Sequence, residues 1–156
     1  MKRCLAVCAC LGLFGSSAAQ AAELTAFLAV AKPGERWAGG AGGAFGVTFF
    51  KILHLEAEAA RLPGEILDQS QWSVVGSALV APAFGRLVPY GGLGVGGYRQ
   101  TDRGRSDTGV IRNLVLGVKL SLGLVLVKGE YRKLTLPEEA LLPMTDRFSV
   151  GAGISF

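Results

Sequence analysis

Much of what catalytic proteins, metalloproteins and helical membrane proteins need is scarce in this 156-residue chain. It has one histidine, His54, and all three of its cysteines lie within the first ten residues. The rest of the chain therefore has no thiol for a disulfide or a thiolate metal site. It also has no block of basic residues that would indicate a nucleic acid as partner. The longest apolar stretch beyond the N-terminus, residues 114–127, contains Lys119 and is too short for a membrane-spanning helix.

The first 21 residues have the pattern of a secretory signal peptide. Lys2 and Arg3 supply a short positive segment, residues 4–15 are apolar, and residues 19–21 (Ala-Gln-Ala) fit the small-residue cleavage rule. We therefore expect residues 1–21 to be removed and residues 22–156 to form one mature domain. Without Lys2 and Arg3, 14 basic side chains stand against 12 acidic ones, which leaves a net charge of only about +2.

Alternation of apolar with polar or small residues is the main pattern of the mature part. In residues 52–62, Leu53 and Leu55 fall on one strand face while His54, Glu56 and Glu58 fall on the other. Eight such segments are expected, each near the length of a tilted transmembrane strand. We place them at residues 23–31, 39–50, 52–62, 72–81, 88–99, 110–120, 124–136 and 147–156. The connections after the first, third, fifth and seventh are expected to be the longer ones.

The last segment shows the alternation most completely, and the chain stops on an aromatic residue. One face carries only apolar side chains: Phe148, Val150, Ala152, Ile154 and Phe156. The other face carries only small or polar ones after Arg147. A strand with two such different faces lies between two different solvents. This segment resembles the C-terminal recognition signal of bacterial outer-membrane β-barrels, which implies the barrel assembly machinery as a partner.

Two further segments extend this resemblance over the chain. Residues 86–90 (RLVPY), followed by glycines at alternate positions, resemble the PYxGxGxG strand of small OmpA/OmpX-type outer-membrane proteins, and residues 130–132 (EYR) resemble another strand of that family. The resemblance implies an all-β fold, an eight-stranded antiparallel transmembrane β-barrel, located in the bacterial outer membrane. An even strand number places both termini in the periplasm and the longer loops outside, among outer-membrane lipid and lipopolysaccharide.

Seven ionisable side chains share the polar faces of these strands, and their charges nearly cancel. A cation that faces lipid near the bilayer midplane costs about 2–4 kcal/mol, so we expect the set inside the barrel. Glu56 and Glu58 are expected to reach Lys128 and Arg132 across the interior, because their strands lie opposite each other in a ring of eight. Such an interior is just wide enough for side chains, which predicts a filled core rather than a pore. The set comprises His54, Glu56, Glu58, Lys119, Lys128, Glu130 and Arg132.

Other candidate sites give weaker signals. His54, Glu56 and Glu58 have donors that suit a metal, but as members of an ion network they need none, and no metal or cofactor is expected. Outer-membrane lipid A deacylases use a His-x-Ser-Asn motif, and Glu occupies the position of its serine here. Arg99, Arg103 and Arg105, in or next to an expected loop at residues 100–109, are candidates for contact with lipopolysaccharide phosphates.

Four aromatic residues fall near expected strand ends, where aromatic girdles anchor barrels at the membrane interface. They are Trp37, Trp72, Tyr90 and Tyr98.

These patterns predict a non-enzymatic, monomeric outer-membrane barrel whose outer loops serve surface interaction or membrane integrity. Two other functions stay open at this point: a narrow channel for small solutes, and a lipid-modifying hydrolase that uses His54. The competing fold is a soluble lipocalin-like barrel, which would place apolar residues inside and the charged set outside.

Overall fold

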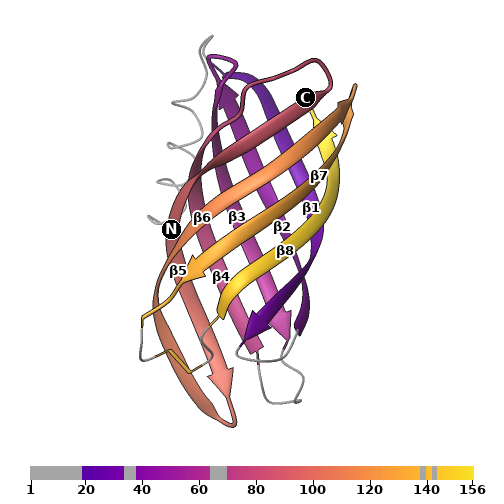
Figure 1. Cartoon of the computed structure of the whole chain (residues 1–156). Helices are drawn as coiled ribbons and strands as arrows, with labels where there is room; N and C mark the ends of the chain where they lie inside the picture. The colour runs from indigo at the N-terminus through magenta and orange to yellow at the C-terminus, as the bar shows by residue number, and fades with distance from the viewer. Residues whose placement is uncertain (1–18, 34–37, 64–69, 138–139, 142–143) are drawn as a thin grey trace, which may run out of the picture.

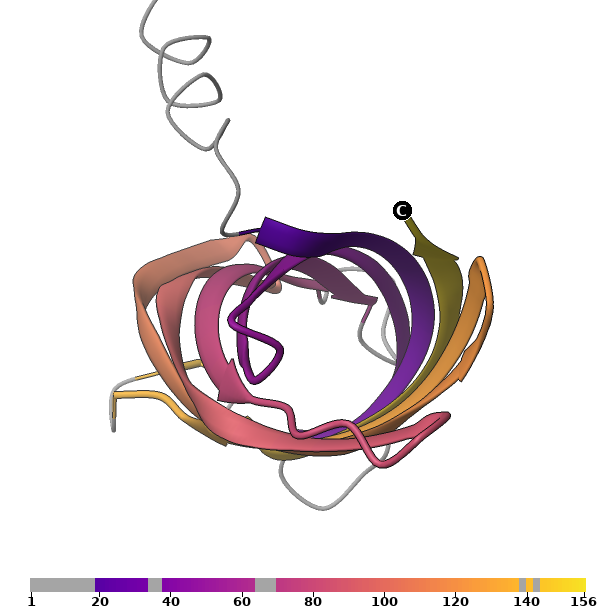
Figure 2. The same ribbon diagram turned by 90° about the horizontal axis from the view of Figure 1, so that it is seen from above.

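The structure is a computed structural model that describes residues 19–33, 38–63, 70–137, 140–141 and 144–156. Its eight strands form a closed antiparallel barrel in which each strand pairs with its neighbours in sequence (Figure 1) and β8 pairs with β1 (Figure 2). The all-β, eight-stranded prediction is therefore confirmed. The strands are β1 (Ala19–Pro33), β2 (Ala38–Phe49), β3 (Leu53–Pro63), β4 (Ser70–Val80), β5 (Leu87–Asp102), β6 (Arg105–Leu122), β7 (Val125–Thr135) and β8 (Met144–Ser155). No helix in the described ranges is long and apolar enough to cross a membrane.

The two ends of the barrel differ. The backbones of Ala22 and Phe156 exchange hydrogen bonds of 2.8 and 2.9 Å, so the ends of the barrel sequence meet at one rim, which we call the terminal rim. The opposite end carries the turn between β5 and β6 and is called the hairpin rim. In Figure 1 the β5–β6 hairpin projects at the foot of the barrel, away from the C-terminus.

The structure corrects the prediction of a loop at residues 100–109. β5 continues to Asp102 and β6 begins at Arg105, so only Arg103 and Gly104 lie between them. Both have positive φ, at 46° and 79°, which is the backbone that a tight two-residue hairpin turn requires. The polar composition of this segment reflects a hairpin that extends past the apolar wall, not a break in the strands.

The expected alternation of long and short connections is also only partly right. On the terminal rim, residues 81–86 separate β4 from β5, a longer gap than residues 103–104 on the hairpin rim. The chain beyond the hairpin rim remains in β-structure at β5 and β6, because the two strands pair with each other up to Asp102 and Arg105. Loop length therefore does not measure how far the chain extends beyond the barrel wall.

The outer face of the barrel wall is mostly apolar, and the ionisable set predicted for the interior lies inside. Leu53, Leu55, Leu116 and Val127 are 37–50% exposed, whereas the charged residues beside them in sequence are buried. The exposed apolar surface runs around all eight strands and exceeds the isolated patches of soluble proteins. A lipocalin-like arrangement, with the charges outside, is excluded.

The alternation had suggested an interior that is polar throughout, but the structure also has buried apolar regions inside the barrel. A buried apolar cluster fills the part nearer the hairpin rim, as shown by Ala60 and Leu62, which follow the inward carboxylates along β3. A smaller cluster lies nearer the terminal rim. The larger cluster contains Phe27, Ala29, Ala31, Ala44, Ala60, Leu62, Val75, Tyr98, Ile111 and Leu134, and the smaller one Leu79, Ala81, Tyr90 and Val115. The charged side chains contact both clusters, since Lys128 and Arg147 lie over the ring of Phe27 and Glu130 accepts from Tyr90.

Candidate functional site: an ion network across the barrel

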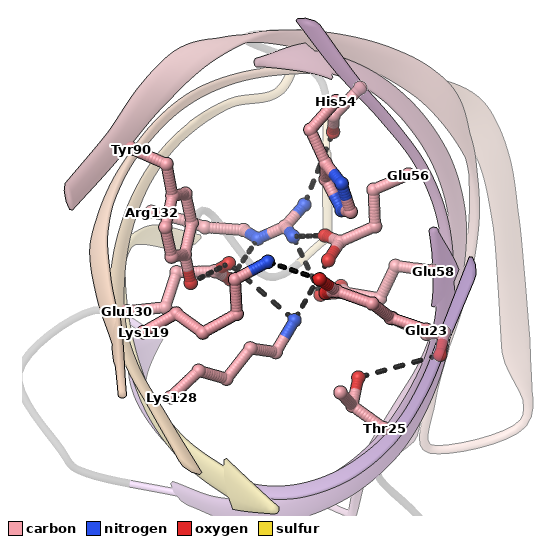
Figure 3. Close-up of polar contacts among 12 residues, drawn as sticks. Glu23, Thr25, His54, Glu56, Glu58, Tyr90, Lys119, Lys128, Glu130 and Arg132 are labelled. Atoms are coloured by element: carbon pink, nitrogen blue, oxygen red, sulfur yellow. Dashed lines mark hydrogen bonds and ion pairs between the residues drawn. The ribbon is translucent and has the colours of Figure 1, made fainter. Parts of the chain in front are cut away.

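Arg132 is the centre of the charged layer. It lies on β7, where alternation turns every second side chain inward, and its side chain is fully buried. Its Nη2 lies 2.5 Å from Glu56 Oε1 and 2.9 Å from Glu58 Oε2, while its Nε lies 2.5 Å from Glu130 Oε1 (Figure 3). One guanidinium thus contacts three carboxylates, two of which come from β3 on the opposite side of the ring.

Three further cations complete the network. Lys128 Nζ lies 2.8 Å from Glu56 Oε2 and 3.8 Å from Glu130 Oε2. Arg147 Nη2 on β8 lies 2.5 Å from Glu58 Oε1. Lys119 on β6 pairs with Glu23 on β1. Every salt bridge found among the described residues lies inside the barrel. Four acidic side chains there balance the charge of four basic side chains.

The structure places all seven of the ionisable residues selected from the sequence inside the barrel and buried. They are His54, Glu56, Glu58, Lys119, Lys128, Glu130 and Arg132. Sequence reasoning missed two members of the layer, Glu23 and Arg147. The signal was present in both cases, because Glu23 precedes the outward Leu24 and Arg147 precedes the outward Phe148. Each stood at the first position of an expected strand, where alternation is easiest to overlook.

His54 stands beside the network rather than in a ligand set. Its Nδ1 lies 3.0 Å from Thr48 Oγ1. Its ring occupies the space above Gly46, where a Cβ would overlap the imidazole. The carboxylates of Glu56 and Glu58 are directed at Arg132 instead. Within the ranges that the structure describes, no three His, Cys, Asp or Glu side chains come together in an arrangement that could hold a metal ion.

Two of the four aromatic residues assigned to an interfacial girdle are in the interior, which corrects that prediction. The Tyr90 hydroxyl donates to Glu130 Oε2 at 3.0 Å, and the Tyr98 hydroxyl donates to Asp107 Oδ2 at 2.9 Å. Each ring lies over a glycine on β6, its cross-strand partner, which leaves room for it. Trp72 does face outward and is half exposed. Trp37 lies outside the described residues.

The three candidate lipopolysaccharide contacts do not form one cluster. Arg99 faces outward from the wall on β5, paired in register with Trp72 of β4. Arg103 and Arg105 are exposed at the tip of the β5–β6 hairpin. Four residues of an extended strand, about 13 Å, separate Arg99 from Arg103.

The side chains of the expected C-terminal signal all lie on the outer face of β8, the strand that closes the ring. They are Phe148, Val150, Ala152, Ile154 and Phe156. The outer face of this segment is therefore apolar from Phe148 to Phe156.

Comparisons with known proteins place this geometry among outer-membrane barrels. No protein-family model and no curated protein sequence matches the chain. Solved structures do. Neisserial surface protein A superposes with a TM-score of 0.64 at 17% identity, over 86% of this chain and 94% of the other. The N-terminal barrel domain of Pseudomonas aeruginosa OprF gives 0.65 at 16% identity, over 90% and 100%. Ail of Yersinia pestis, in complex with the heparin analogue sucrose octasulfate, gives 0.51 at 12% identity, over 90% and 100%.

Proposed function

We propose, from the premise that this chain has the fold of small eight-stranded outer-membrane barrels, that it is an integral, non-enzymatic outer-membrane protein whose interior is closed to solutes. The apolar outer face meets the lipid, and the terminal rim faces the periplasm. The hairpin rim then faces the cell exterior. The C-terminal strand carries the signal for the assembly machinery.

The observation that carries the closed interior is the ion network together with its two apolar neighbours. Arg132, Lys128 and the carboxylates of β3 bridge the full width of the barrel, from β7 to β3. The larger apolar cluster adds a second layer nearer the hairpin rim. Opening a water path through the first layer would separate buried ion pairs, and the second layer offers water no polar partner.

Conductance in planar lipid bilayers tests the closed interior directly. The purified barrel should show no steady conductance above a few tens of picosiemens. A variant in which Arg132, Glu56 and Glu58 are replaced by alanine removes the centre of the ionic layer and tests, if it folds, whether the apolar layer alone keeps the interior closed. Steady openings in the wild-type protein would favour a narrow channel and end this part of the proposal.

Location is tested by fractionation and by gel migration. A folded outer-membrane barrel resists SDS until it is boiled, so the unboiled and boiled chains should migrate differently. Deletion of Phe156 should lower the yield of the heat-modifiable form in cells, because it removes the last residue of the assembly signal. A soluble chain with one migration position would contradict the membrane assignment.

The exposed tip of the β5–β6 hairpin is the proposed surface-contact element. Arg103 and Arg105 stand on it beyond the apolar wall, within reach of lipopolysaccharide phosphates, and a guanidinium suits phosphate through paired hydrogen bonds. Replacing both by glutamine should reduce retention of lipopolysaccharide by cells or by reconstituted barrels. Unchanged retention would leave this tip without the proposed role.

A further inference from the structure

An unusual row of side chains crosses three neighbouring strands on the outer face. Arg61 on β3 lies opposite Trp72 on β4, and Trp72 lies opposite Arg99 on β5. All three face outward and are exposed. The Arg61 guanidinium lies 5.4 Å from the centroid of the Trp72 ring, a cation–π distance. The row stands near the hairpin rim, since β3 ends and β4 begins two residues beyond it.

These arginines differ from the arginines of the interior, because no salt bridge among the described residues involves them. The wall around them is mostly apolar, and Arg112 on β6 and Lys133 on β7 are other exposed cations that face outward from it. Cations on the lipid face cost little only near the interfaces, about 0–1 kcal/mol, where headgroups supply counter-charges. An anionic headgroup at this height would meet Arg61 and Arg99, whose backbones stand about two strand spacings, roughly 10 Å, apart, with Trp72 between them.

A groove lies on the side of the row toward the terminal rim, and its lining residues come from β2 to β6. Its volume is about 840 Å³, within the range of sites that hold small organic ligands. Three small residues in adjacent strands, Ala57, Gly76 and Ala78, lie between larger apolar side chains on both sides. The larger apolar lining residues are Phe45, Val47, Phe49, Leu55, Leu93 and Val95, and Arg112 on β6 adds an exposed cation to the lining. Gly76 is four residues from Trp72, so the groove lies about 13 Å from the cationic row.

We infer that the row and the groove form one lipid site, which binds a phosphorylated, acylated lipid of the outer leaflet. Arg61 and Arg99 contact phosphate groups of the lipid, Trp72 packs against the headgroup, and an acyl chain lies in the groove over Gly76. The site rests on the proposed function, since it requires the hairpin rim to face the outer leaflet. It lies apart from the hairpin tip, on the wall itself.

A second copy of this chain fits the same surface less well. Two barrels in one membrane have the same orientation, so a two-fold dimer through this face brings each arginine row against the identical row at the same height. Like charges placed opposite one another disfavour that contact. A phosphate neutralises the row, whereas a second copy doubles its charge.

The site is tested by native mass spectrometry of the folded barrel in neutral detergent, titrated with diphosphorylated lipid A. The same lipid without phosphates is the comparison ligand. Arg61→Gln and Arg99→Gln should each weaken binding of the phosphorylated lipid about tenfold, because each removes a charge-assisted hydrogen bond. Neither should change binding of the dephosphorylated lipid by more than about twofold.

Two matched variants on the opposite wall serve as controls. Lys133→Gln removes an outward cation from β7, and Gly129→Leu adds there the bulk that Gly76→Leu adds to the groove. Neither glycine has an atom close enough to obstruct a new Cβ, since the nearest contact at Gly76 is 3.9 Å and Gly129 has none within 4 Å. Gly76→Leu should weaken binding of both lipid forms several-fold. The two control variants should bind as wild type.

The outcomes separate the site from the function on which it rests. Equal losses in Lys133→Gln and the arginine variants would show general charge attraction and overturn the site. Equal binding of both lipid forms by the wild-type barrel would do the same, and a dimer in the absence of lipid that Gly76→Leu abolishes would assign the groove to a second copy. In all three cases the barrel would remain heat-modifiable. A wild-type chain that is not heat-modifiable would overturn the proposed function first.

Discussion

Arg132 and Arg61 carry the same guanidinium on the two faces of one barrel wall, and their surroundings share almost nothing. Arg132 is fully buried and contacts the carboxylates of Glu56, Glu58 and Glu130. Arg61 is exposed and contacts only the ring of Trp72 among the interactions found for it. Inside, charge is balanced within the protein itself. Outside, the counter-charge has to come from the surroundings.

The difference shows how each face accommodates a cation. The interior is narrow and closed to bulk solvent, so an unpaired charge there carries its full desolvation cost. The outer face can hold a cation only near a rim, where water and headgroups are within reach. Removing a cation from the inner face should therefore lower stability. Removing one from the outer face should weaken binding of anionic headgroups and leave stability almost unchanged.

The largest effect is expected from Arg132→Met. It leaves three buried carboxylates without their common partner, which should lower the free energy of unfolding by about 3–5 kcal/mol or prevent folding. Urea-induced unfolding in lipid vesicles, followed by loss of the heat-modifiable band, measures the change. Arg61→Met is the matched control and should shift stability by no more than about 0.5 kcal/mol. Similar losses in both variants would remove the distinction between the two faces.

The Lys119–Glu23 pair should show a smaller, coupled effect. Its side chains are 10–11% exposed, more than those around Arg132, so water relieves part of the loss. Lys119→Met and Glu23→Gln should each cost about 1–3 kcal/mol, and the double variant should cost less than their sum. A double-mutant cycle of unfolding free energies checks this. Strict additivity would show that the pair contributes nothing as a pair.

Substitutions of glycine compare the inner and outer faces of the barrel without changing any charge. Gly46→Ala places a Cβ in the space of the His54 ring, and the required shift should cost about 1–3 kcal/mol. Adding His54→Ala should recover most of that loss. Gly129→Ala on the outer face meets no atom within 4 Å and should be close to neutral. Thermal migration shifts on gels rank the three variants, and a neutral Gly46→Ala would show that the imidazole moves freely.

The smallest effect is expected at Asn113, an inward polar residue outside the ion network. Neither atom of its buried amide has a hydrogen-bond partner within the described structure. Asn113→Val should therefore change the free energy of unfolding by less than about 1 kcal/mol, or raise it. The same unfolding assay decides. A loss comparable to that of Lys119→Met would show that the amide has a partner in solution.

Much of the barrel wall could be predicted, because the alternation of apolar with polar residues is visible within the sequence of each single strand. Leu53, Glu56 and Lys128 were assigned to the correct faces from alternation alone, and six of the eight expected strands began within three residues of the observed ones. The exceptions are β1, which starts four residues earlier than expected, and β6, which starts earlier because its first part lies beyond the apolar wall. The turn at Arg103 and Gly104 was missed for the same reason, since polar composition outside a membrane does not distinguish a loop from a hairpin.

The contacts between residues across the barrel were harder to predict than the strand face that each residue occupies. Tyr90 and Tyr98 share one face of β5 with Gly92, Gly94 and Gly96, but their position near expected strand ends suggested an interfacial role. Only the structure shows that glycines on β6 make room for the two rings. The buried cluster around Phe27 and Ile111 likewise followed from no single strand, because its members come from seven different strands.

The sequence by itself determined which side of each strand meets lipid, because successive side chains of a strand point to opposite faces whatever the strand pairs with. It also determined that the inward charges nearly cancel. Only the tertiary structure decided that Arg132 meets three carboxylates and that Arg61, Trp72 and Arg99 stand in one row. Those neighbours depend on register and on closure of the ring, which join residues far apart in sequence and leave no period along the chain.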